Sequence, residues 1–405
     1  MPATHLTQQA AAYLHYLCHE LPTRRVGSAG NQAATAYFRQ VVAGFGFHTD
    51  IVSFDCLDWQ CDHARLTAGD TTFAVQASPY SLGGRFAAPL LAAATPAELA
   101  ALDPAGHILL LHRDLAGEQF MPKHFPFYNP EEHQQIIRRL ETKPPLAIVA
   151  ASRPGSALAG GLYPYPLFED GDFNIPSLFM SEEEGQRLLP YVGRQVSYDV
   201  AARRIPATGE NVSARKGDLA RRVVISAHID SKLGTPGALD NGAGVVTLLL
   251  LAELLAGYQG HLGVELMPFN GEDYYAASGE LAYLAQQLGR PDEILLNVNI
   301  DAAGYHQGRT AYSLYGCPAG ITQAIHATFA GDPAFIEGEL WYQSDHAIFT
   351  QQQIPAAAIT SELMGDLFSH ITHTERDTPD IIDCARLAGL AQALQRLVHL
   401  LNALA

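Results

Sequence analysis

The chain has 405 residues, 48% of them hydrophobic, and a formal net charge of -17. This length and apolar content predict more than one globular domain, and the negative charge argues against a partner bound through phosphate groups, so we expect no nucleic acid. The apolar run "VVTLLLLA" is much shorter than the roughly 20 residues that cross a bilayer, so we expect no membrane partner. The N-terminal stretch "MPATHLTQQAAAYLHYLCHELPTRR" lacks the pattern of a secretory signal, which favours a cytoplasmic location.

The first half of the chain predicts a helix followed by an inserted module. Residues 31–45 carry apolar side chains at helical spacing and end near a glycine, which predicts an amphipathic helix. From residue 55 to 206, short apolar strands alternate with loops rich in Pro, Gly, Tyr and Phe. We therefore predict a β-rich inserted domain over 55–206, and a main domain formed by 1–54 and 207–405. The five cysteines show no metal-finger spacing, and their odd number predicts reduced thiols.

The second half changes to alternating strands and helices. Strands are predicted at 221–228, 261–270 and 293–301, and helices at 245–257 and 278–289. This order predicts an α/β domain in which a mixed, mostly parallel central sheet is flanked by helices.

Polar residues with metal-binding chemistry follow these strands. The strands and their adjoining loops carry His228, Asp230, Asp240, Glu272, Asp273 and Asp301, and the C-terminal loops add Asp345, His346, His373 and Asp377. Because His228 and Asp230 stand two residues apart, both point to the same side, where the carboxylate can orient the imidazole of a metal ligand. Ligand sites of open α/β sheets form at the carboxyl ends of strands, so these residues are expected to converge.

Taken alone, each of these residues also has a structural explanation. A histidine at a strand end is usually hydrogen-bonded, and an aspartate before a helix usually caps it. The combination of these residues indicates a metal site more specifically than any one of them, because two imidazoles with several carboxylates suit Zn²⁺ or a similar divalent ion. A carboxylate shared between two ions is typical of metal-assisted hydrolysis.

The order of these motifs resembles the M28 family of zinc aminopeptidases. The matching pieces are "RRVGSAGN", "AHIDS", "GALDNGAG", "NGEDYYAASG", "NIDAAG", "SDHAIF" and "THTERDT". The resemblance covers residues 1–52 and 207–405, and the segment between them is similar to the protease-associated (PA) domain that is often inserted in this family. It implies a zinc exopeptidase fold, a peptide substrate and two Zn²⁺ ions, with Co²⁺ or Mn²⁺ as possible replacements.

The resemblance also implies a role for each matching residue. His228 and Asp301 would hold one ion, Asp273 and His373 the other, and Asp240 would bridge them. The catalytic residues would be Glu272, as general base, and Asp230, which would orient His228. Asp377 is expected to act in the same way near His373, and the Asp240–Asn241 peptide is expected to be cis.

Two features depart from the family pattern. The acidic pair is Glu-Asp where Glu-Glu is common, so Asp273 is one methylene shorter than the usual ligand. Thr372 stands where some relatives have a tyrosine that stabilises the oxyanion, and Tyr342 or His370 are the candidates to replace it.

The leading hypothesis is a dizinc aminopeptidase, and three alternatives stay open. A carboxypeptidase or dipeptidase needs a cation for the substrate carboxylate, for which Arg309 and Arg376 are candidates. A glutaminyl-cyclase-like acyltransferase would use a single zinc, and Asp345 suits its proton transfers. A non-catalytic binding protein would be expected to have lost ligands. The sequence leaves the oligomeric state undetermined.

Overall fold

The computed structural model describes residues 3–21, 23–287 and 290–404. The chain forms two compact units, which are described separately below. The larger unit comprises 1–56, 208–367 and 371–405, and the insert unit comprises 57–207 with 368–370. Two long strands, β1 (His48–Ala68) and β8 (Gln195–Lys216), each continue from one unit into the other.

The larger unit is built on a mixed sheet in the order β13-β12-β14-β11-β9-β10-β8. The strands are β9 (Arg222–His228), β10 (Gly263–Phe269), β11 (Ile294–Ile300), β12 (Thr310–Tyr315), β13 (Phe335–Glu337) and β14 (Ala356–Ser361). The four neighbouring strands β14, β11, β9 and β10 run parallel, and β8 and β12 add antiparallel pairings. The prediction of a mixed, mostly parallel sheet is confirmed.

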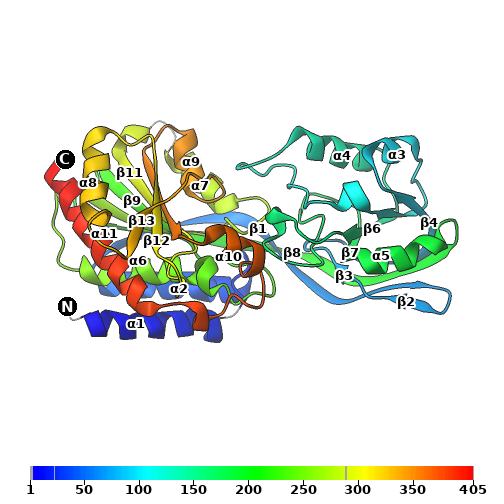
Figure 1. The fold of residues 1–405 in the computed structure, drawn as a ribbon, viewed down its shortest axis with the longest axis horizontal. Coiled ribbons are helices and arrows are strands. Elements are labelled where there is room, and N and C mark those ends of the chain that lie inside the picture. The colour runs from blue at the N-terminus through cyan, green and yellow to red at the C-terminus, as the bar shows by residue number, and fades with distance from the viewer. Residues whose placement is uncertain (1–2, 22, 288–289, 405) are drawn as a thin grey trace. The chain divides into compact units, whose positions relative to one another are not determined.

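Helices cover this sheet (Figure 1). They are α1 (Ala3–His15), α2 (Ala29–Gly44), α6 (Ala243–Leu254), α7 (Ser278–Gln287), α8 (Ala319–Phe329), α9 (His346–Gln351), α10 (Met364–His370) and α11 (Cys384–Leu404). The helix α11 packs against α1, α6 and α8 in one layer, whereas α7 and α9 meet β10 through ring contacts among Phe269, Tyr283 and Phe349. Among the described residues, no helix is both long and apolar enough to cross a bilayer.

The helix α6 explains the leucine run that follows the glycine-rich turn. Every residue from Ala243 to Ala252 is buried, because α6 lies between β9 and β10 on one side and α1 and α11 on the other. A helix that is buried on all sides has an apolar sequence all round instead of an amphipathic one. Its burial fixes the turn at its N-terminal end against the sheet.

The predicted elements of the larger unit are confirmed with small shifts at their ends. The predicted helix 31–45 is α2, and 245–257 is α6. The predicted helix 278–289 is α7, although its last two predicted residues lie outside the described residues. All five cysteines are described, and each is a thiol outside any disulfide.

The insert unit contains helices as well as strands. Strands β4 (Gly84–Ala93), β5 (Ile108–Leu111), β6 (Ala147–Ser152) and β7 (Ser177–Ser181) run parallel. The short β3 (Gln76–Ala77) pairs with β7, and the short β2 (Thr71–Phe73) pairs with β1. The helices are α3 (Pro96–Ala101), α4 (Glu131–Thr142) and α5 (Glu182–Leu188). The helices α3 and α4 are features that the β-rich prediction missed, and the assignment as a PA-like domain remains a prediction.

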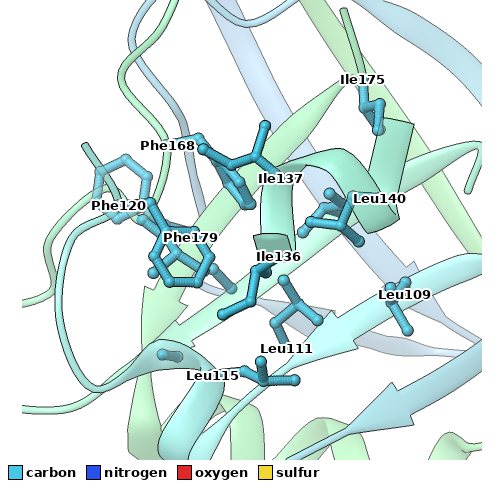
Figure 2. Packing of buried hydrophobic residues seen from close by; sticks show 14 of the residues in the cluster. Leu109, Leu111, Leu115, Phe120, Ile136, Ile137, Leu140, Phe168, Ile175 and Phe179 are labelled. Carbon is cyan, nitrogen blue, oxygen red and sulfur yellow. The ribbon is translucent and has the colours of Figure 1, made fainter. Parts of the chain in front are cut away.

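The insert unit has its own hydrophobic core. Figure 2 shows Ile136, Ile137 and Leu140 of α4 in one cluster with Leu109 and Leu111 of β5. Buried aromatic side chains, among them Phe168 and Phe179, complete the cluster. A separate core is what an independently packed module requires.

Candidate metal centre

The sheet brings its polar residues to one edge. Because β9, β10 and β11 run parallel, their carboxyl ends lie at the same edge, where β9 ends at His228 and β11 is followed by Asp301. Glu272 and Asp273 follow the end of β10. The turn Ala238–Gly242, which precedes α6, supplies Asp240.

All five expected ligands come together in two groups that share Asp240. His228, Asp240 and Asp301 form the first position, and Asp240, Asp273 and His373 form the second; in each group the ligand atoms lie within 4.8 Å of one another. One oxygen of Asp240 lies 3.0 Å from His228 Nε2, and the other lies 3.1 Å from His373 Nε2. Asp301 Oδ1 is 3.6 Å from His228 Nε2, and Asp273 Oδ1 is 3.2 Å from His373 Nε2. The two oxygens of Asp240 therefore face the two groups of candidate ligands.

The donor atoms fit metal ions. His228 Nε2, Asp301 Oδ1 and Asp273 Oδ2 are buried, and none has a hydrogen-bond partner within the described part of the chain. Buried polar atoms are nearly always satisfied, so lone pairs that converge without donors indicate a cation. Two imidazole nitrogens and three carboxylates form a donor set suited to Zn²⁺. The positions differ in exposure, because the side chain of His228 is 0% exposed and that of His373 is 21% exposed.

The carboxylates also control the protonation of the two histidines. Burial alone would lower the pKa of His228, but Asp230, Asp240 and Asp301 raise it well above its usual value. The pKa of His373 is raised in the same way, against burial, by Asp273 and Asp240. A cation held by these imidazoles would compete with protons for the ring nitrogens, so its affinity would depend on pH.

The turn that carries Asp240 is held by Asp377. The Asp377 carboxylate accepts hydrogen bonds from the backbone N–H groups of Leu239, at 2.6 Å, and Asp240, at 3.0 Å. Asp377 was expected to orient His373, but its carboxylate binds the backbone N–H groups of Leu239 and Asp240. Burial, together with the charge of Asp240, raises the pKa of Asp377 to about 7. The Asp240–Asn241 peptide is cis, as the resemblance implies.

Asp230 holds the second acidic turn. Its carboxylate accepts the backbone N–H groups of Gly271, at 3.1 Å, and Asp273, at 3.2 Å. It also lies 3.6 Å from His228 Nδ1, although that nitrogen is closer, at 3.2 Å, to the backbone oxygen of Asp230. The carboxylate thus faces the backbone behind the ligands, and we assign Asp230 as a positioning residue.

Glu272 belongs to neither ligand group and lies close to the first one. Its Oε2 lies 4.0 Å from His228 Nε2, and its side chain is 15% exposed. Burial raises the pKa of Glu272 well above its usual value, and the charges of Asp301 and Asp273 add to this effect against the opposing charge of His228. A carboxylate with raised basicity beside the ligand atoms has the properties of a general base.

Further contacts at the site are not visible in local sequence patterns. Ser344 Oγ donates to Asp301 Oδ2 at 2.7 Å, and the Lys232 ammonium donates to the backbone oxygen of Asp273 at 3.1 Å. The motif "SDHAIF" drew attention to Asp345 and His346, but the adjacent serine makes the contact with a ligand. The imidazole of His346 instead faces the backbone oxygen of Trp341 at 2.8 Å.

Tyr342 and Arg309 were also candidates for roles at the site. The side chain of Tyr342, a candidate for oxyanion stabilisation, is 55% exposed. Arg309, a candidate for binding a substrate carboxylate, makes two side-chain bonds to Glu362, at 2.6 and 3.0 Å. Its guanidinium is therefore already engaged.

Comparison with known proteins finds a match to one family model. Residues 211–398, which include all the expected ligands, match the model of peptidase family M28. The rest of the chain lies outside this match. A probable lipoprotein aminopeptidase, LpqL of Mycobacterium tuberculosis, is 25% identical to the chain over 238 residues, or 56% of the chain. This match spans 44% of LpqL, less than half the length of that relative.

Solved structures share the fold of this chain. The aminopeptidase from Aneurinibacillus sp. strain AM-1 has a TM-score of 0.75 at 20% identity, and covers 97% of this chain and 93% of its own. The zinc aminopeptidase of Bacillus subtilis has a TM-score of 0.70 at 17% identity, and covers 97% of this chain and 94% of its own. At these identities the likeness establishes the fold.

Proposed function

We propose that the protein is a dizinc aminopeptidase that hydrolyses the N-terminal bond of peptides. The observation that carries this proposal is Asp240, whose two oxygens face two separate groups of ligands. The match to peptidase family M28 and the names of the related aminopeptidases support a peptide substrate.

The chain's own residues suit each step of such a hydrolysis. When bound by His228, Asp240, Asp273, Asp301 and His373, zinc would polarise the scissile carbonyl and make a water molecule more acidic. Glu272 would accept a proton from the attacking water and deliver it to the leaving amine. Asp230 and Asp377 hold the two turns that carry Asp273 and Asp240, so the ligands need little rearrangement.

The alternatives have less support from the site. A single-zinc acyltransferase would not need His228 beside Asp240, yet both are buried and aligned. A carboxypeptidase would need a free cation for the substrate carboxylate, and Arg309 is engaged with Glu362. A binding protein that has lost catalysis would not be expected to keep the full ligand set.

A substrate panel tests the proposal. The zinc-loaded protein would be assayed on free dipeptides, longer unblocked peptides, N-acetylated peptides, C-terminally amidated peptides and peptides that begin with glutamine. We expect cleavage of unblocked and amidated peptides, release of the first residue, and loss of activity after chelation. Activity confined to N-acetylated peptides, or cyclisation of N-terminal glutamine without hydrolysis, would contradict the proposal.

A further inference from the structure

The guanidinium of Arg24 binds the segment that connects His228 to Asp240. Arg24 is 1% exposed. Its Nε donates to the backbone oxygen of Ile229 at 3.0 Å, while Nη1 donates to Pro236 at 2.9 Å and Nη2 to Gly237 at 2.7 Å. A fourth bond, from Nη1 to the backbone oxygen of Leu17 at 2.8 Å, ties this segment to the N-terminal part of the chain.

These four hydrogen bonds use most of the N–H donors of the arginine side chain. A guanidinium has five N–H donors in a rigid fork, and here four bonds go to backbone carbonyl oxygens. Three of the four acceptors belong to one segment. A single rigid group thus fixes both the start and the end of 229–237, which leaves the chain between two metal ligands little freedom.

The turn 236–240 is held from two sides. Arg24 binds its carbonyl oxygens at Pro236 and Gly237, and Asp377 binds its N–H groups at Leu239 and Asp240. The two side chains come from opposite ends of the sequence. Between them they specify where the Asp240 backbone lies, and therefore where its carboxylate points.

Gly237 is adapted to this arrangement. It has the left-handed conformation, with φ 59°, which favours glycine. A Cβ at this position would lie 2.8 Å from Arg24 Nη2 and 2.7 Å from the backbone oxygen of Asp240. Any larger residue would therefore push apart the guanidinium and the bridging residue.

We propose that Arg24 is a positioning residue that fixes the bridging carboxylate of Asp240 and so sets the zinc affinity of both metal positions together. This inference rests on the proposed function. Arg24 lies outside the residues 211–398 that match the family model, so the metal centre depends on a part of the chain beyond that match. Contacts behind metal ligands typically change metal affinity by about 10- to 100-fold, which sets the expected scale.

The test measures zinc binding to the full-length protein. Zinc affinities of the wild type, Arg24→Met and Arg24→Lys would be determined by competition with a chelator, and the metal-free proteins would be compared by urea unfolding. The matched control is Arg25→Met, because Arg25 is the next residue and is only partly buried. We expect Arg24→Met to weaken both zinc affinities by about tenfold or more, Arg24→Lys to weaken them less, and Arg25→Met to leave them unchanged.

The outcomes separate positioning from a purely structural role. If Arg24→Met lowers the unfolding midpoint but keeps both zinc affinities within about twofold of the wild type, the inference is wrong. If Arg24→Met does not fold, Arg24→Lys and Gly237→Ala are judged by the same criterion. If the wild type binds zinc and cleaves peptides but the variants keep their zinc affinities, only this inference is overturned. If the wild type binds no zinc, the proposed function is overturned as well.

Discussion

Replacing Glu272 with glutamine is the sharpest test of the proposed chemistry. Glutamine keeps the shape of the side chain but cannot accept a proton at the carboxylate. Because Glu272 belongs to neither ligand group, Glu272→Gln should keep both zinc ions. A general base contributes about 10²- to 10⁴-fold to the rate, or roughly 3 to 5.5 kcal/mol of transition-state stabilisation.

The assay combines steady-state kinetics on an unblocked peptide with elemental analysis for zinc. Asp273→Ala is the contrasting variant, since it removes a ligand and should empty the second position. Glu280→Gln is the matched control, because Glu280 is also a fully buried carboxyl group but lies in neither ligand group. Full activity in Glu272→Gln would refute the mechanism. Loss of zinc from Glu272→Gln with both ions kept by Asp273→Ala would show that the two roles are reversed.

Three further predictions concern the surroundings of the site. Ser344→Ala removes the 2.7 Å hydrogen bond to Asp301. Zinc affinity at the first position, measured by chelator competition, should therefore fall by about 10- to 100-fold, while that of the second position changes little. Equal weakening of both affinities would contradict this prediction. Burial and the nearby Asp230 raise the pKa of Glu280 from 4.5 to about 8, so in the metal-free protein the free energy of unfolding should decline as pH rises between these values. In Glu280→Gln this decline, which can reach about 1.4 kcal/mol per pH unit in the wild type, should be smaller. If the free energy of unfolding of Glu280→Gln, measured with urea, declined with pH as steeply as that of the wild type, the raised pKa could not belong to Glu280. Chelation should abolish hydrolysis, and added zinc should restore it; activity that survives exhaustive chelation would exclude a metal-dependent reaction.

The sequence alone predicted the α/β part of the fold, and the family resemblance named the candidate ligands. Buried strands such as 222–228 and the leucine-rich α6 appear as short, uninterrupted apolar runs, because each is covered on all sides. Parallel order then places residues that follow different strands at a common edge, which is why His228 and Asp301 were expected to meet. The pairing of ligands into two positions came from the family resemblance, and the geometry of Asp240 agrees with it. The insert unit was less predictable, because its helix α4 lies among loops whose composition suggested strands.

Only the tertiary structure decided which side chains hold the ligands in place. Arg24 and Gly237 are 213 positions apart, Asp377 and Leu239 are 138 apart, and Asp301 and Ser344 are 43 apart. Each contact is a hydrogen bond to a backbone group or a ligand oxygen, and it leaves no periodic signal in the residues around it. Asp377 illustrates the difference: its place beside His373 in sequence suggested that it orients the imidazole, whereas folding brings the backbone N–H groups of the Asp240 turn within its reach. A buried carboxylate binds the donors that the fold places beside it, and these can come from a turn far away in the chain.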